Sequence, residues 1–321
     1  MTLKDHSLLV VTPVFEDREA SARLFAELGH LFGRDVYVIA VDDGSVRQPL
    51  DPASLQSAGV AGVVIRLRRN VGHQRAIAIG LGYAAEHMTD GQRLVVMDSD
   101  GEDVPATIGP LLEALRSPEV DVAVAQRKSR VESLRFKAFY QVYKRFFSVM
   151  TGRAISFGNF MALKRHAVRR LVAMQELGIH VAGAVLASRL RAVTCPLDRG
   201  PRYAGQSKMN FVGLALHGFK ALMVFAEDVL VRVGIACAAI AALSVVAVAA
   251  AIGLKLMGFS TPGWFSLVLG ILVLMFMQTA ALALMTLMLT GVVRSGSVAT
   301  SVAYRDFIDQ VLPVEAPGEA V

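Results

Sequence analysis

Residues 94–103 read LVVMDSDGED. The first four residues are apolar and typical of a short buried strand, and the acidic residues that follow would form the loop at its end. Alternate side chains of extended backbone share one face, so Asp98, Asp100 and Glu102 are expected to lie together. Such carboxylates repel one another unless a cation lies among them, and oxygen ligands suit Mg²⁺ or Mn²⁺. The stretch predicts a strand that ends in a metal-binding loop, with an ordinary solvated acidic loop as the alternative.

The same kind of short apolar segment recurs on both sides of this stretch. Helix-like segments lie between several of the strands, at 19–31, 74–87 and 106–115. The predicted strands are 7–14, 36–41, 63–67, 94–97 and 122–125. Alternation of strands and helices predicts an α/β fold with a mostly parallel sheet that is covered on both faces.

Charged and polar residues follow each predicted strand. Ligands of parallel sheets bind beyond the carboxyl ends of the strands, so these residues are expected to share one site. The segments, in chain order, are TPVFED (12–17), DDGS (42–45), RNVGH (69–73), DSDGED (98–103) and QRKSR (126–130).

Two long apolar runs account for the 54% hydrophobic content of this 321-residue chain. They span 233–254 and 264–289, and Lys255 is the only charged residue between 233 and 293. Each run is long enough to cross ~30 Å of hydrocarbon. Gly258 and Pro262 favour a turn between them, which predicts a transmembrane hairpin; a buried hairpin of a soluble protein is the alternative. Arg232 and Arg294 flank the hairpin, so both chain ends are expected in the cytoplasm.

The charge and the cysteine content agree with a cytosolic domain at a membrane. The net charge of +6 suits lipid headgroups and phosphates and, beside a membrane segment, favours them over nucleic acid. A generally basic surface without a specific partner is the alternative. Two cysteines, Cys195 and Cys237, indicate no disulfide framework. The N-terminus lacks the pattern of a signal peptide.

Two further segments have amphipathic patterns. Residues 133–150 combine an aromatic face with basic residues, which suits either a membrane interface or ordinary core packing. Residues 211–232 lead directly into the first apolar run, which favours the interface. We therefore expect a cytosolic domain at 1–210, an amphipathic helix at 211–232, the hairpin at 233–293 and a cytosolic tail at 294–321.

Residues 80–85, GLGYAA, match the sequence pattern of a dinucleotide-binding fingerprint but not its structural context. The preceding residues HQRAIAI are helical in pattern, whereas the fingerprint requires a strand and a turn. Small residues that allow close helix packing are the better interpretation.

The order of TPVFED, VDDGS, RNVGHQRAIAIGL, MDSDGED and RYAGQSK resembles the family 2 glycosyltransferases of GT-A fold. Within that family the chain is similar to the polyprenyl-phosphate branch, which includes dolichol-phosphate mannose synthase and bacterial undecaprenyl-phosphate glucosyltransferases. The motifs run from residue 7 to about residue 210, and the C-terminal hairpin is similar in kind to that of the bacterial members. The resemblance implies a GT-A (Rossmann-like, mostly parallel sheet) catalytic domain in front of a transmembrane hairpin.

The resemblance also implies roles for individual residues. Asp98 and Asp100 would act in catalysis, with Asp98 also near the sugar and Asp100 and Glu102 on the metal. Asp103 is a second candidate for a catalytic base. The donor would contact Pro13, Glu16, Asp42 and Asp43, and the phosphates of donor and acceptor would contact Arg127, Arg130, Arg202, Ser207 and Lys208.

Asn159 departs from the family pattern, because some relatives carry Asp at this position. An amide cannot act as a general base, which places base catalysis from this position in doubt. A phosphate acceptor needs no general base, because its second pKa is about 6 and it is largely ionised near neutral pH.

The expected activity is metal-dependent, inverting transfer of a sugar from a UDP- or GDP-linked donor to a polyprenyl phosphate at a bacterial-type inner membrane. A transferase with another lipid or protein acceptor, or a catalytically silent nucleotide-binding scaffold, remains open. A processive synthase would need a Q-x-x-R-W motif, but Trp264 is the only tryptophan and lies in the second apolar run. Assembly into a homo-oligomer is also open.

Overall fold

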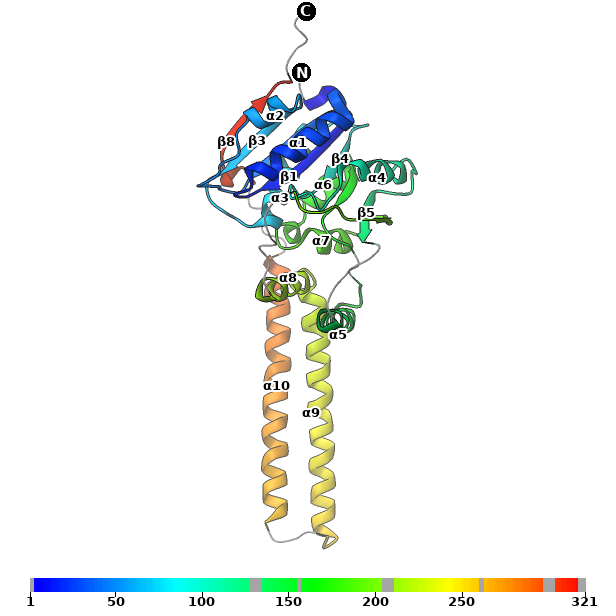
Figure 1. Ribbon diagram of the computed structural model, residues 1–321. Coiled ribbons are helices and arrows are strands. Elements are labelled where there is room, and N and C mark those ends of the chain that lie inside the picture. Colours follow the sequence, from blue (N-terminus) through cyan, green and yellow to red (C-terminus); the bar gives the residue numbers. More distant parts are fainter. Residues whose placement is uncertain are drawn as a thin grey trace, which may run out of the picture. The chain divides into compact units, whose positions relative to one another are not determined.

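The computed structural model describes residues 3–127, 134–154, 157–203, 211–259, 263–296 and 304–316. The chain forms two compact units (Figure 1). The first contains Met1–Lys144, Ala154–Val224 and Ser301–Val321, and the second contains Arg145–Arg153 and Phe225–Thr300.

The first unit is built on a sheet of eight strands in the order β7-β5-β6-β4-β1-β2-β3-β8. Strands β1 to β5 and β7 run in one direction, and β6 and β8 run against them. The predicted mostly parallel α/β fold is confirmed. The strands are β1 (Leu8–Val14), β2 (Val36–Asp42), β3 (Ala61–Leu67), β4 (Arg93–Val96), β5 (Val122–Arg127), β6 (Met161–Lys164), β7 (Ala192–Leu197) and β8 (Ile308–Val314).

Helices cover both faces of this sheet because alternate residues of the central strands point to opposite sides. On one face, Leu9, Val11 and Ile39 pack with α3 and its neighbours; on the other, Val10 and Val38 pack with α1 and its neighbours. The covering helices are α3 (His73–His87), α6 (Arg165–Val172) and α7 (Val181–Ala187) on the first face, and α1 (Arg18–Phe32), α2 (Ala53–Ser57) and α4 (Ile108–Ala114) on the second. The three predicted helices correspond to α1, α3 and α4.

The GLGYAA segment lies inside helix α3, which confirms the helix-packing interpretation. A Cβ on Gly80 would approach the Val11 side chain to 2.5 Å, and one on Gly82 would approach the Tyr304 ring to 2.8 Å. Both glycines are therefore positions of close packing against a strand and against the segment that precedes β8.

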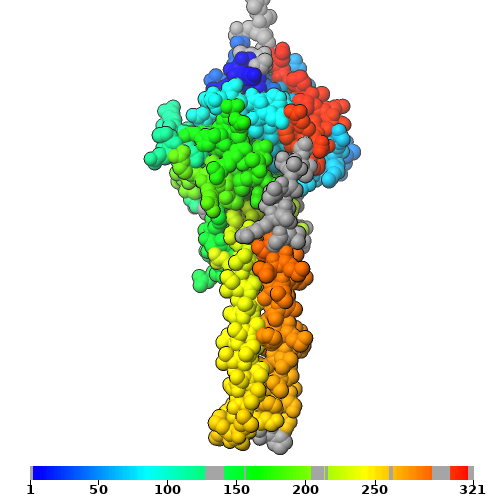
Figure 2. Space-filling view, turned by 180° about the vertical axis from the view of Figure 1, so that it is seen from behind, coloured from blue at the N-terminus to red at the C-terminus, as the bar shows by residue number. Residues whose placement is uncertain are grey.

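Strand β8 is the largest difference from the predicted organisation. The sequence pattern assigns 294–321 to a tail, yet Ile308–Val314 pairs antiparallel with β3 and forms an edge of the sheet. Just before it, the Tyr304 hydroxyl and Arg305 both contact Glu86 of α3. Figure 2 shows this red C-terminal segment lying on the surface of the globular unit.

The second unit is dominated by two antiparallel helices, α9 (Ala226–Leu256) and α10 (Trp264–Gly296), which pack side by side (Figure 1). Both are long and apolar enough to cross a membrane. The predicted amphipathic helix at 211–232 is divided, because α8 ends at Met223 and α9 begins at Ala226. Phe225 interrupts the helix with φ −111° and ψ 30°, and its side chain is buried.

Helix α5 (Leu134–Thr151) is packed against protein on one side, and its role at a membrane interface stays a prediction. Phe147 is buried and lies edge-on to the Phe225 ring, at 5.9 Å between ring centroids. Val142, Phe146 and Val149 are exposed. One side of the helix therefore packs into protein, while apolar side chains elsewhere on it remain uncovered.

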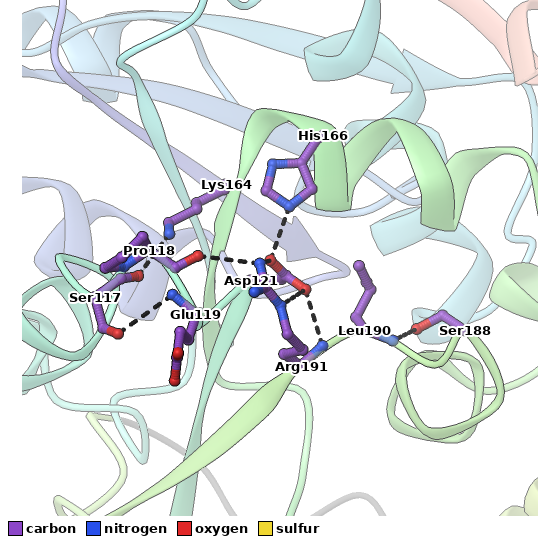
Figure 3. Close-up of polar contacts among 9 residues, drawn as sticks. All are labelled: Ser117, Pro118, Glu119, Asp121, Lys164, His166, Ser188, Leu190 and Arg191. Atoms are coloured by element: carbon purple, nitrogen blue, oxygen red, sulfur yellow. Dashed lines mark hydrogen bonds and ion pairs between the residues drawn. The ribbon is translucent and has the colours of Figure 1, made fainter.

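Asp121 joins β5, β7 and α6 at the amino ends of the two strands (Figure 3). Its carboxylate accepts hydrogen bonds from the backbone N–H and the guanidinium of Arg191, at 2.9, 3.1 and 2.7 Å, and contacts His166 Nε2 at 3.0 Å. These bonds from Arg191, although opposed by desolvation, hold the pKa of Asp121 well below its usual range.

We expect Asp121→Asn to lower the free energy of unfolding by about 1–2 kcal/mol at neutral pH, because a buried acceptor of several bonds loses its charge. The depressed pKa makes this contribution complete above the unfolded value of about 3.9 and progressively lost below it. Urea unfolding followed by circular dichroism at several pH values tests both points. Asp90→Asn is the control, since its ion pair with Arg165 involves an 89% exposed carboxylate. Equal effects of the two variants would contradict the prediction.

Candidate active site

The parallel strands β1 to β4 bring four polar loops to one edge of the sheet. β1 lies between β4 and β2, and β3 lies beside β2, so the loops that follow them are neighbours. These loops contain Glu16, Asp42–Asp43, His73 and the acidic segment 98–103. The sheet topology therefore brings the residues that follow these four strands to one edge, as predicted.

Asp42 and Asp43 brace the loops with their carboxylates. Asp42 accepts the backbone N–H groups of Ser45 and Leu50, at 3.0 and 2.9 Å. Asp43 accepts those of Val71 and Gly72, at 2.7 and 3.0 Å, and so connects the end of β2 to the loop before α3. Both side chains are buried, and burial raises the pKa of Asp43.

Glu16 holds the loop after β2 in a similar way. Its carboxylate accepts the backbone N–H groups of three consecutive residues, Val46, Arg47 and Gln48, at 2.8, 3.0 and 2.8 Å. These bonds, led by that from Arg47, lower the pKa of Glu16. Pro13 is buried in β1, and its carbonyl accepts the Ser99 hydroxyl at 3.1 Å. Both residues thus have structural roles here, and their contact with a nucleotide stays a prediction.

The acidic segment 98–103 is folded into a tight loop by its own carboxylates. The Asp98 N–H donates to Asp103 Oδ2 at 2.9 Å, and the Glu102 N–H donates to Asp100 Oδ1 at 3.0 Å. Asp103 is 8% exposed, and burial together with the charge of Asp98 raises its pKa to about 8. Asp103 therefore stabilises the loop through its hydrogen bond to the Asp98 backbone. Asp100 and Glu102 each have carboxylate oxygens that contact other partners.

Two arginines that follow β7 are the partners of those oxygens. Arg202 Nη2 lies 2.9 Å from Asp100 Oδ2, and Arg202 Nε lies 3.1 Å from Glu102 Oε1. Arg199 contacts the other oxygen of Glu102. Arg202 was expected at the site, but Arg199 was not singled out in the sequence; its position three residues before Arg202 was the available signal.

His73 is a further site residue that the sequence pattern did not single out, although it lies within the RNVGHQ motif. As the first residue of α3, it places Nε2 3.1 Å from Asp98 Oδ1 and 3.2 Å from Asn159 Nδ2. Desolvation lowers the pKa of His73, but the charge and the hydrogen bond of Asp98 outweigh it, so the pKa is raised. The structure thus places His73 beside both Asp98 and Asn159, and its Nε2 either donates to the Asp98 carboxylate or accepts from the Asn159 amide.

Comparison with known proteins identifies the domain that carries this edge. Residues 9–178 match the sequence model of glycosyl transferase family 2. The chain belongs to this family. The family 2 chain is 27% identical over 289 residues to the uncharacterized glycosyltransferase sll0501 of Synechocystis sp., a match that covers 86% of this chain and 87% of that relative. The predicted family and the predicted class of enzyme, a glycosyltransferase, are confirmed.

Solved structures of glucosyl-3-phosphoglycerate synthase from Mycobacterium tuberculosis are also similar, with a lower sequence identity. One, in complex with Mn²⁺, UDP and phosphoglyceric acid, has a TM-score of 0.48 and 14% identity and covers 71% of this chain and 78% of that chain. Another, with Mn²⁺, UDP-glucose and phosphoglyceric acid, has a TM-score of 0.47 and 17% identity over 71% and 79%.

The carboxylates of this glycosyltransferase fit a hard divalent cation. Asp100 and Glu102 both touch the guanidinium of Arg202, so oxygens of the two residues converge within reach of one cation. Among the described residues, no group of three or more His, Cys, Asp or Glu side chains is arranged to hold a metal. Mg²⁺ commonly binds through one or two carboxylates together with substrate phosphates, and Asp100 and Glu102 supply two carboxylates of the kind such a site uses.

Several predicted phosphate-binding residues cannot be located at the site. Arg127 is the last residue of β5, and nothing is described of its side chain. Arg130, Ser207 and Lys208 lie outside the described residues. Their roles remain predictions.

We expect Glu16→Ala to release the loop at 46–48, because three backbone donors lose their acceptor. Amide exchange of these residues should accelerate about tenfold, because each of them loses a charge-assisted hydrogen bond that protects it. Hydrogen–deuterium exchange with mass spectrometry is the measurement. Glu19→Ala, an exposed carboxylate of α1, is the control and should leave the loop unchanged. Unchanged exchange in Glu16→Ala would show that the loop is held by other contacts.

Proposed function

We propose that this glycosyltransferase transfers a sugar, with inversion at the anomeric carbon, from a UDP- or GDP-linked donor to a polyprenyl phosphate. The observation that carries the proposal is the pairing of Asp100 and Glu102 with Arg199 and Arg202 at the carboxyl edge of a family 2 sheet. Carboxylates that converge on a cation and arginines beside them form a site for a diphosphate and its metal.

The donor would lie over the loops that follow β1, β2 and β4. Glu16, Asp42 and Asp43 give these loops their shape through backbone hydrogen bonds, which leaves the loop backbone as a preformed surface for the nucleotide. Arg202 has the planar donor pattern that binds phosphate oxygens in pairs. A divalent cation held by Asp100 and Glu102 would neutralise charge on the departing diphosphate.

The transfer would be a direct displacement. An oxygen of the acceptor phosphate forms a bond to the anomeric carbon, while the bond from that carbon to the donor diphosphate breaks with its electron pair. A phosphate monoester is largely ionised near neutral pH, so no protein base is required. His73, held by Asp98, and Arg127 would contribute positive charge near the two phosphates.

The membrane hairpin supports a lipid acceptor. Helix α9 extends over 31 residues and the apolar part of α10 over 27, lengths of about 46 and 40 Å at 1.5 Å per residue. Most of their apolar side chains are not covered by protein. The chain enters α9 directly after α8 and returns from α10 to β8, and both α8 and β8 belong to the globular unit. Both ends of the hairpin therefore face the same side, which with Arg232 and Arg294 would be the cytosolic side of the inner membrane.

Helix α8 (Phe211–Met223) carries an apolar surface suited to a membrane interface. Leu216, Phe219 and Met223 share one side of the helix at spacings of three and four residues, and all three are more than half exposed. Ala221 and Val224 are buried in the globular unit. The exposed side would contact lipid at the depth of the headgroups.

The first test is release of nucleoside diphosphate by the detergent-purified protein. We expect release only when a divalent cation, a matching UDP- or GDP-sugar and polyprenyl phosphate are all present. Asp100→Ala should reduce the rate about a hundredfold or more, because charge on the leaving group is no longer stabilised. Asp90→Ala, which removes an exposed carboxylate of the same unit, is the matched control and should keep full activity.

The other outcomes separate the alternatives. Release that depends on the cation but not on the lipid would retain the transferase and exclude the polyprenyl phosphate as acceptor. Binding of nucleotide without release from any donor would favour a silent scaffold.

Phe219→Ser tests the contact of α8 with lipid. We expect the KM for polyprenyl phosphate to rise about fivefold, since burial of an aromatic side chain is lost, while the KM for the donor stays unchanged. The measurement is steady-state kinetics in vesicles. Leu31→Ser, a 46% exposed leucine of α1, is the control. An unchanged acceptor KM in Phe219→Ser would contradict a lipid contact at α8.

A further inference from the structure

The segment 198–203, which we call the arginine strap, lies over the acidic loop. It leaves the end of β7, and two backbone hydrogen bonds join it to the loop. The Gly200 N–H donates to the Glu102 carbonyl at 3.1 Å, and the Tyr203 N–H donates to the Asp100 carbonyl at 2.8 Å. The backbone of the strap is thereby fixed beside both candidate metal ligands.

Tyr203 anchors the strap a second time. Its hydroxyl donates to Glu27 of α1 at 2.6 Å, and the Arg23 guanidinium lies 4.5 Å from its ring centroid. The ring packs on Gly101, where φ is +88° and a Cβ would come within 2.7 Å of the ring. Only glycine accommodates both the backbone conformation and this contact. The end of the strap is therefore held by α1 and by the loop, independently of the arginine side chains.

The arginine side chains have more freedom than the backbone that carries them. Arg199 and Arg202 are 33% and 29% exposed, and each reaches the carboxylates through a long, flexible stem. The fork of Arg202 spans one oxygen of Asp100 and one of Glu102. Rotation of the side chains can release both carboxylates without opening the strap.

We propose that Arg199 and Arg202 serve as internal counter-cations, which occupy the metal-binding carboxylates in the metal-free enzyme and turn to the donor diphosphate when those carboxylates receive the divalent cation. This inference rests on the proposed metal-dependent transfer and specifies how the site binds its substrate. The partner of the released guanidinium groups is a nucleoside diphosphate.

The charges explain why this exchange favours the metal and the donor together. Two guanidinium groups balance the two carboxylates as completely as one divalent cation would. A cation that arrives alone must displace both arginines and leaves them without an anionic partner. With a diphosphate present, the planar guanidinium groups gain phosphate oxygens, for which their geometry is suited. The strap thereby disfavours binding of the cation without the donor.

Binding of Mn²⁺ alone to the full-length protein, followed by electron paramagnetic resonance, tests the inference without turnover. We expect Arg202→Ala to bind Mn²⁺ about fivefold to tenfold more tightly than the wild type, because the competing charge-assisted bonds are absent. The additional gain in Mn²⁺ affinity on adding UDP or GDP should be smaller in this variant than in the wild type. Arg202→Lys, which keeps the charge but cannot span both carboxylates, should lie between the two.

Arg165→Ala is the matched control. It removes the same charge from a side chain of nearly equal exposure, 30%, which pairs with Asp90 instead. Thermal unfolding of each variant verifies that it is folded. Tighter Mn²⁺ binding in Arg165→Ala as well would reduce the effect to general electrostatics and overturn the inference. Unchanged, weaker or absent Mn²⁺ binding in folded Arg202→Ala would also overturn it, whereas the transferase proposal is decided separately by donor turnover.

Discussion

Many carboxylates share one edge of the sheet, and their mutual repulsion must be balanced for the loops to pack together. The structure uses two kinds of partner for this. Backbone N–H groups serve Asp42, Asp43, Glu16 and Asp103, which turns each of these acids into a brace for a loop. Charged side chains serve the others, with Arg199 and Arg202 on Glu102 and Asp100 and with His73 beside Asp98.

This division separates acids that shape the site from acids that are available to a ligand. A carboxylate whose oxygens accept backbone N–H groups is fixed as firmly as the loop that it holds. A carboxylate that is paired with an arginine side chain can exchange that partner for another cation. Glu102 belongs to the second group, and Asp100 belongs to both, because its Oδ1 accepts the Glu102 N–H while its Oδ2 faces Arg202. Under the proposed function, the oxygens that face the arginines are the ones that would bind a metal.

The return of the chain to the sheet is a second constraint on function. Strand β8 follows α10 and pairs with β3, while α8 precedes α9 in the same globular unit. Because the chain leaves the globular unit before α9 and returns to it after α10, both ends of the hairpin lie on the same side of any membrane that it spans. This holds whatever the flanking charges are. The topology therefore requires that both chain ends lie on the same side as the globular unit, independently of Arg232 and Arg294. It also assigns residues 304–316 to the globular unit rather than to a tail.

The sequence by itself determined the five parallel strands β1 to β5, the family and the acidic loop, because runs of buried apolar residues and residue order are local properties of the chain. It did not predict β6, β7 or β8. β6 passes directly into α6 at Arg165 without turn residues, β7 is a half-exposed edge strand, and β8 needs a partner more than 200 residues away. Only the tertiary structure decided which acids are braces and which face Arg199 and Arg202, and it alone brought His73 to Asp98 and Asn159. Those pairings depend on distances between loops that are remote in sequence, and a carboxylate has the same chemistry in the sequence whichever partner the fold provides.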